Sequence, residues 1–348
     1  MKITHYFPGG NTAQGFYSRF EDILPAPARR RMFYLKGGPG VGKSTLMRRV
    51  GEAAQKAGLE VEYFHCSSDP DSLDGVCLPQ RGAALMDGTA PHVYDPVVPG
   101  ARDTLVSLGD FLDEAALRPH AADILRLQAE ISGRFRRCYH YLRAAQEVLE
   151  AACPGREDPR VARELAQEWT KTLPLRGGSG SVRRLFGAAY TPKGRVDLLD
   201  GLEMERCVRV DCPFGLNAGE LMEEIARQAA GRGLHAVALL DPLCPRQVSH
   251  VLIPAQGVAF LTGRRNNADR DGWEDTKGLF WMEETSEKEQ GFDRNAHELL
   301  IQRAIEQLSA AKTLHDELES HYVGHMDFLK WQTALDRVLD AGSAVFLI

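Results

Sequence analysis

A repeat of about half its length organises this 348-residue sequence. Residues 33–88 align without a gap on residues 208–263, and 12 of these 56 positions are identical. The similarity extends upstream, where Phe7, Thr12 and Gly15 fall on Phe186, Thr191 and Gly194. Self-similarity at a fixed offset predicts one structural unit built twice. We therefore predict two tandem domains, 1–176 and 182–348, separated by the glycine- and serine-rich segment 176–181.

Strands and a helix alternate at the start of each repeat. In the first, apolar runs at 32–35, 59–64 and 83–87 predict buried strands, and apolar residues recur at helical spacing from Leu46 until Gly58. This alternation predicts an α/β fold with parallel sheets. Long amphipathic stretches at 124–149 and 301–322 predict one helical insertion in each repeat. We expect these helices to pack as antiparallel hairpins or at a contact between the domains.

A glycine-rich motif lies between the first predicted strand and the helix. Residues 37–44 have the spacing G-x-x-x-x-G-K-S, in which backbone N–H groups and the helix dipole hold phosphate. Lys43 is predicted to reach the β- and γ-phosphates and Ser44 to bind Mg²⁺, with Asp87 as the second magnesium residue. The sequence thus predicts ATP and Mg²⁺ as ligands, and ATP is preferred because the guanine signature Asn-Lys-x-Asp is missing. The predicted nucleotide-binding residues are Gly38, Pro39, Gly40, Val41, Gly42, Lys43, Ser44 and Thr45.

Polar residues follow the second and third predicted strands of the first repeat. Asp69, Asp71 or Asp74 could orient a water or an acceptor hydroxyl, or bind magnesium through water; equally, the segment could form turns and a helix N-cap. His65 and Cys66 could form a metal pair, but neighbours on a strand point to opposite faces. Thr89 and His92 could polarise the attacking group or belong to a simple turn.

The second repeat has lost the residues that carry this chemistry. Asn217, Ala218 and Gly219 stand where the first repeat has Gly42, Lys43 and Ser44, and Thr262 replaces Asp87. The two predicted domains are therefore P-loop NTPase-like, and the second is degenerate. Arg264 and Arg265 follow a strand end in this repeat. They could stabilise charge on a transferring phosphate across the domain interface, or form a solvated turn.

The chain resembles a family of uncharacterised bacterial tandem P-loop proteins known as ATP-binding or ATPase-like. The resemblance rests on residues 5–12, 33–45, 65–75, 87–92 and 185–194, and it covers nearly the whole chain. It implies ATP as the ligand and supplies no physiological substrate. In that family the second repeat often carries an intact phosphate loop. This sequence departs from the family there, which argues against a symmetric two-site mechanism.

The net charge and hydropathy of the chain argue against nucleic acid and membranes as partners. The formal net charge is −6 and the pI is about 6.0, so no global basic field recruits nucleic acid or anionic lipid. No apolar stretch is long enough to span a bilayer, and no signal peptide is evident at the start. The seven cysteines contain no C-x-x-C pair. We expect a cytoplasmic protein that binds a nucleotide and an unknown protein or small-molecule partner.

The favoured activity is slow ATP hydrolysis coupled to a conformational change. Lys43 and Asp87 would act at the phosphates and magnesium, and an aspartate of the 69–74 segment, of which we select Asp69, would orient water. A kinase for a small molecule or nucleotide is the first alternative, with an acceptor in place of water. A nucleotide-gated binding module with negligible catalysis is the second. A nucleic-acid-stimulated ATPase is least favoured by the acidic composition.

Overall fold

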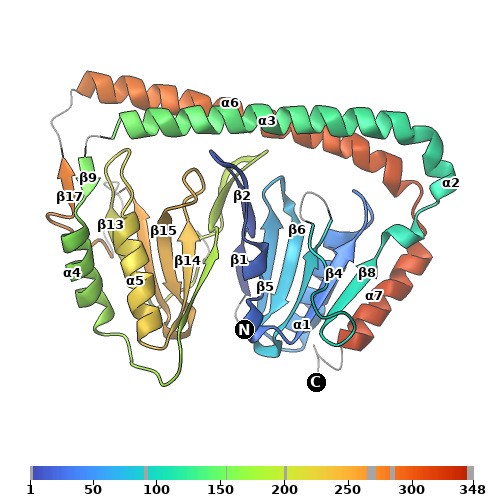
Figure 1. Ribbon diagram of the computed structural model, residues 1–348, viewed down its shortest axis with the longest axis horizontal. Coiled ribbons are helices and arrows are strands. Elements are labelled where there is room, and N and C mark those ends of the chain that lie inside the picture. Colours follow the sequence, from blue (N-terminus) through green and yellow to red (C-terminus); the bar gives the residue numbers. More distant parts are fainter. Residues whose placement is uncertain are drawn as a thin grey trace.

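Two β-sheets pack face to face between outer helices, and two long helices cross one end of both sheets (Figure 1). The structure is a computed structural model that describes residues 3–89, 93–153, 155–199, 202–264, 272–282 and 287–342. The fold is mixed α/β with parallel pairings in both large sheets, as the sequence predicts at this level. We call residues 1–176 the first unit and 182–348 the second.

The first sheet has six strands in the order β1-β5-β6-β7-β4-β8. β6 is antiparallel to both its neighbours, whereas the other pairings are parallel. The predicted parallel pairing therefore holds for three of the five strand pairs, and the 69–74 segment, expected to form turns or a helix N-cap, begins a strand. The strand β6 was not predicted, because its first residues are Ser, Asp and Pro, which usually form turns, and its apolar part begins only at Leu73. The strands are β1 (Ile3–Tyr6), β4 (Arg31–Lys36), β5 (Val61–Cys66), β6 (Asp69–Leu78), β7 (Ala83–Asp87) and β8 (Asp103–Ser107).

The second sheet repeats this plan in the order β10-β14-β15-β16-β13. Its pairings keep the offset of the sequence repeat: Phe33 is opposite Leu85 in the first sheet, and Val208 is opposite Phe260 in the second. The antiparallel middle strand is also repeated. The strands are β10 (Ser181–Leu185), β13 (Arg206–Asp211), β14 (His235–Leu240), β15 (Val248–Ile253) and β16 (Val258–Gly263).

Equivalent residues of the two units meet where a small third sheet joins them. Its order is β12-β11-β2-β3, from β2 (Gly9–Thr12), β3 (Gly15–Ser18), β11 (Ala188–Thr191) and β12 (Gly194–Asp197). Phe7 N–H donates to Phe186 O at 2.9 Å, and Phe186 N–H donates to Phe7 O at 3.1 Å. Because these two residues occupy the same place in the repeat, the units contact each other as a two-fold-related pair would.

The long helices α3 (Ala121–Ala151) and α6 (Glu287–Val323) pack antiparallel against each other across both units (Figure 1). Arg126 of α3 lies 3.6 Å from Glu317 of α6, and Ala145 O is 2.9 Å from His297 Nδ1. The sequence left two arrangements open for these helices, a hairpin or a contact between the domains. The structure shows the contact, because α3 of one unit packs against α6 of the other. Each helix thus extends from its own unit to the far side of the other.

Because α3 and α6 cross over, the segment that follows each helix packs on the sheet of the other unit. After α3 the chain forms β9 (Gly155–Glu157) and α4 (Pro159–Thr170), and α4 packs with α5 (Gly219–Gly231) on the second sheet. After α6, helix α7 (Phe328–Gly342) packs with α1 (Lys43–Lys56) on the first sheet. The boundary at 176–182 divides the sequence repeats, but each hydrophobic core contains a helix from the other unit. The remaining elements are the short helix α2 (Glu114–Leu117) and β17 (Phe280–Met282), which pairs with β9.

The inner faces of the two sheets form a shared core. Met32, Tyr34 and Phe64 of the first sheet cluster with Val237 and Leu239 of the second. Arg183 crosses this interface to pair with Glu62 at 2.8 Å, and the Arg183 and Glu62 side chains are each 14% exposed. Arg183 is therefore a largely enclosed link between the sheets.

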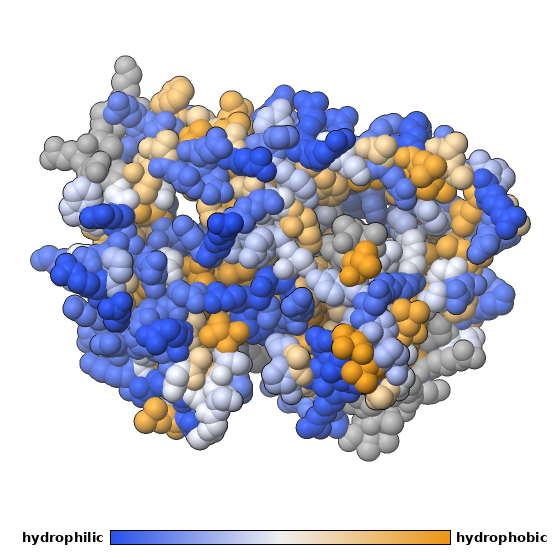
Figure 2. All heavy atoms as spheres, in the orientation of Figure 1, coloured by the Kyte–Doolittle hydropathy of each residue, from blue (hydrophilic) through white to orange (hydrophobic). Residues whose placement is uncertain are grey.

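On the face shown in Figure 2, hydrophilic side chains predominate, and the apolar ones gather in small separate groups. Within the described part of the chain, no helix combines the length and the apolar character needed to cross a bilayer.

Candidate functional site

A glycine-rich loop, residues 37–42, leads from the carboxyl end of β4 into α1. Gly40 and Gly42 have φ angles of +71° and +83°, in the left-handed region that glycine adopts without a steric cost. Gly42 is also the residue that precedes the first turn of α1. The predicted strand, loop and helix are therefore found in the predicted order, and the N-terminus of a 14-residue helix faces the loop.

Lys43 and Asp87 lie together at this loop. Lys43 Nζ donates to the carbonyl oxygens of Gly37 and Gly38, both at 2.8 Å, and lies 3.6 Å from Asp87 Oδ2. The side chains of Lys43 and Asp87 are 13% and 16% exposed. Asp87 reaches this position because β7 runs parallel to β4, with Leu35 opposite Asp87. Thr89 closes the loop, because its N–H donates to Asp87 Oδ1 and its hydroxyl accepts from Gly37 N–H; His92 lies outside the described residues.

A buried aspartate completes the charged group beside Lys43. Asp74 is 7% exposed, on the strand β6 that the sequence did not predict. Burial raises the pKa of Asp74 to about 8, and the negative charge of Asp87 adds to this increase. Ser44 is close to the same strand, since its hydroxyl accepts the N–H of Leu73 at 3.0 Å. Of the three aspartates considered from the sequence, Asp74 is the one enclosed at the site.

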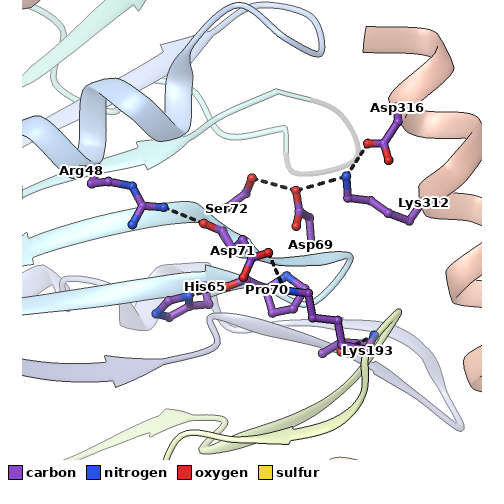
Figure 3. A network of polar contacts seen from close by, with 10 residues as sticks. Arg48, His65, Asp69, Pro70, Asp71, Ser72, Lys193, Lys312 and Asp316 are labelled. Atoms are coloured by element: carbon purple, nitrogen blue, oxygen red, sulfur yellow. Dashed lines mark hydrogen bonds and ion pairs between the residues drawn. The ribbon is translucent and has the colours of Figure 1, made fainter. Parts of the chain in front are cut away.

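Asp69 and Asp71 lie instead at the tip of the β5–β6 hairpin, where two lysines of the second unit reach them (Figure 3). Lys312 of α6 is 3.5 Å from Asp69, which also accepts from the Ser72 hydroxyl at 2.9 Å. Lys193 pairs with Asp71. The selected residue Asp69 is thus part of an inter-unit ion pair, and the hairpin tip is fixed to both α6 and the β11–β12 turn.

His65 and Cys66 do not act as a pair. His65 Nδ1 lies 2.7 Å from Pro70 O, and its Nε2 lies 2.9 Å from His5 Nδ1. Both ring nitrogens of His65 therefore have protein partners. The Cys66 thiol is buried, and burial raises its pKa well above the usual value.

The second unit covers the glycine-rich loop. A Cβ atom at Gly38 would lie 3.1 Å from Tyr322 Cε1, one at Gly40 would lie 2.7 Å from Val323 Cγ2, and one at Gly42 would lie 2.7 Å from Trp331 Nε1. These neighbours belong to the end of α6 and the start of α7, almost 300 residues after the loop. This contact could not be predicted from local patterns, because nothing in residues 319–331 relates them to residues 37–42.

The equivalent loop of the second unit, residues 212–217, has a different environment. Glu157 of β9 accepts the N–H groups of Glu220 and Leu221, at 2.9 and 2.7 Å, at the N-terminus of α5. Burial raises the pKa of Glu157 to about 7, although these two N–H groups oppose the increase. Asn217 Nδ2 donates to Ser249 Oγ at 3.1 Å, and the Ser249 hydroxyl donates to Asp241 Oδ2 at 3.2 Å. The loop lies beside a cavity of about 1000 Å³ that is also lined by Arg184 and Arg246.

Arg264 lies at this second loop and not across the interface at the first. Its guanidinium is over the ring of Phe214, 5.4 Å from the centroid, and Arg294 of α6 lies over the same ring at 4.8 Å. The structure therefore does not bring Arg264 to the glycine-rich loop as the inter-domain hypothesis requires. Arg265 lies outside the described residues.

Comparison with known protein families shows a similarity over part of the chain. A family model described as Nephrocystin 3, N-terminal, matches residues 14–77. The matched segment runs from just before β3 to nearly the end of β6 and contains the glycine-rich loop and α1. No curated protein shows a significant match to the chain. No solved structure shows one either.

Proposed function

We propose that the first unit binds Mg²⁺ and ATP at the glycine-rich loop and hydrolyses ATP slowly. The observation that carries this proposal is the position of Lys43, which spans the loop carbonyls and Asp87 at the carboxyl ends of β4 and β7. Ligands of α/β proteins bind at this end of the strands. A lysine that is enclosed by a loop before a helix N-terminus is suited to phosphate groups.

The donor set also suits magnesium. The Ser44 hydroxyl and the carboxylates of Asp87 and Asp74 are oxygen ligands of the kind that Mg²⁺ prefers. Bound Mg²⁺ would neutralise charge on the phosphates. Because the pKa of Asp74 is raised to about 8, this carboxyl group can carry a proton at neutral pH. Bound Mg²⁺ would favour the ionised form of Asp74, so we propose that Asp74, rather than Asp69, loses its proton when the metal binds and then helps to hold the metal or to orient water.

We propose the two units as P-loop NTPase-like domains of which only the first is active. The shared strand order and repeated register support a common origin of the two units. In the second loop the charged positions are neutral, and Glu157 occupies the helix N-terminus where an anionic ligand would bind. The second unit would then contribute to the first site by covering the first loop with α6 and α7.

The test is calorimetric binding of MgATP, MgADP and MgGTP, with phosphate release measured in parallel. We expect Lys43→Ala to lower the affinity for MgATP about 100-fold, because charge-assisted hydrogen bonds to phosphate are lost. Lys56→Ala, at the exposed end of the same helix, is the matched control and should bind as wild type does. No binding by wild type, or equal binding by Lys43→Ala, would contradict the proposal.

A nucleotide-gated binding module is the second candidate, and the contacts between the loop and residues 319–331 favour it. The same contacts could transmit occupancy of the loop without hydrolysis. Phosphate release at the background rate, together with Lys43-dependent binding, would select this candidate. Release of ADP only when an acceptor is added would instead select a kinase.

A further inference from the structure

Trp331 of the second unit lies beside the start of α1. It is 5% exposed, and its Nε1 atom lies 2.7 Å from the position that a Cβ at Gly42 would take. Gly42 is the last residue of the loop before Lys43. The indole N–H is therefore buried beside the backbone that we propose as the phosphate-binding element.

This N–H group has no hydrogen-bond partner among the described residues. An indole N–H can only donate, and a buried donor without an acceptor is costly. Most buried polar groups in proteins are paired, so an unpaired one calls for an acceptor that joins later. An anionic oxygen bound at the adjacent loop would be such an acceptor.

The surroundings of Trp331 hold the ring in place. The Arg49 guanidinium of α1 lies over the indole, 5.2 Å from the ring centroid, and Arg49 donates to Gln332 at 2.9 Å. Asp327 accepts the N–H groups of Leu329 and Lys330 and so caps the start of α7. The donor is thus fixed before any ligand binds, which reduces the entropy cost of using it.

The loop at 212–217 has no indole N–H in the equivalent place. Asp158 and Asp327 cap α4 and α7 in the same way, and their N–H groups donate to the equivalent residues Leu279 and Phe111. By this alignment Ala162 occupies the place of Trp331, and Glu157 occupies that of Met326. The capped helix beside the loop with Lys43 thus carries Trp331, whereas the capped helix beside the loop with Ala218 carries Ala162 and is preceded by Glu157.

We propose that Trp331 is a nucleotide-binding residue of the first site, whose indole N–H donates to a phosphate oxygen of the bound nucleotide. This inference rests on the proposed function. It means that the site is completed by both units, since α7 reaches the first loop through α6. A nucleotide bound at the loop would then contact α7 of the second unit directly.

The experiment follows the indole N–H resonances of the ¹⁵N-labelled full chain during titration with MgADP, which avoids turnover. The protein has four tryptophans, and Trp331→Phe assigns the resonance of interest. We expect this resonance to move downfield on saturation with MgADP. We also expect Trp331→Phe to weaken MgADP binding about tenfold, because an aromatic ring remains at this position while the N–H donor is lost. Trp281→Phe, an exposed position on β17, should bind as wild type does.

The outcomes separate the two proposals. Binding that depends on Lys43, with an unmoved Trp331 resonance and unchanged affinity in Trp331→Phe, overturns this inference and leaves the proposed function intact. No MgADP binding by wild type overturns both. If Trp331→Phe does not fold, the wild-type resonance still decides, because Phe variants of Trp169, Trp273 and Trp281 assign it by elimination.

Discussion

The glycine-rich loop of the first unit and its counterpart at 212–217 share a backbone plan and differ in what lies against it. Beside the first loop are Lys43, Asp87 and the buried Asp74. At the second, Ala218, Thr262 and Ser249 take these three positions. The two units share strand order and register, while these three positions carry ionisable side chains at the first loop and neutral ones at the second.

The two helix N-termini show the same difference. Glu157 accepts two N–H groups at the start of α5, whereas among the described residues no carboxylate accepts the N–H groups at the start of α1. A helix N-terminus attracts negative charge, so an internal carboxylate there takes the place that a phosphate would need. At the start of α5 these donors are thus satisfied by a side chain of the same protein.

The largest expected effect tests what the loops share. Gly40 and Gly215 have φ angles of +71° and +85°, and a Cβ would lie 2.7 Å from Val323 and 3.0 Å from Cys153 Cα, respectively. We expect Gly40→Ala and Gly215→Ala each to lower the free energy of unfolding by about 3 kcal/mol, from backbone strain and the clash with the crossing helix. Urea denaturation measures this.

Gly58 provides the control for that experiment, since its φ is +79° and a Cβ there would meet open space. Gly58→Ala therefore reports the strain alone, about 1 kcal/mol. If Gly40→Ala and Gly215→Ala lower the free energy of unfolding by no more than Gly58→Ala does, the helix ends do not contact the loops as closely as described.

The next effect tests the buried carboxyl group of Asp74, in whose place the second unit has Ser249. Because burial raises the pKa of Asp74 to about 8, the folded protein holds this proton more tightly than the unfolded chain does. The free energy of unfolding should therefore fall as the pH rises from 4 towards about 8. We expect Asp74→Asn to remove about 2 kcal/mol of this fall, measured by urea denaturation at two pH values in that range.

Ser249→Ala, at the equivalent position of the second unit, should leave the pH dependence of wild type unchanged. An equally steep pH dependence in Asp74→Asn would mean that Asp74 is ionised in the folded protein at neutral pH.

The smallest effect concerns the carboxylate at the second loop. Burial raises the pKa of Glu157 from 4.5 to about 7. The protonated side chain therefore contributes its full stabilisation below pH 4.5, and this contribution is lost as the pH rises through about 7. We expect Glu157→Gln to flatten this part of the stability profile by about 1 kcal/mol, measured by thermal or urea unfolding. Glu164→Gln, on the exposed side of α4, should not change the profile. An unaltered slope in Glu157→Gln would contradict the assigned environment.

Local patterns predicted much of the first unit. The strand before the loop, the loop glycines, the helix to Lys56 and the strand that ends in Asp87 all lie where spacing and apolar runs indicated. The strand β6 was missed because its first half consists of residues that usually form turns. The choice of Asp69 over Asp74 followed from the same error, since only the pairing of β6 with β5 and β7 shows which aspartate is buried.

The sequence by itself determined the duplication, the lysine and aspartate at the first loop, and their loss from the second. These features depend on residue types at short spacings, which remain readable along the chain. Only the tertiary structure decided that α3 and α6 cross, that each unit ends on the other's core, and that Trp331 and Glu157 lie at the two loops. Such contacts join residues far apart in sequence, and they form because each amphipathic helix must bury its apolar face wherever the fold offers a complementary one.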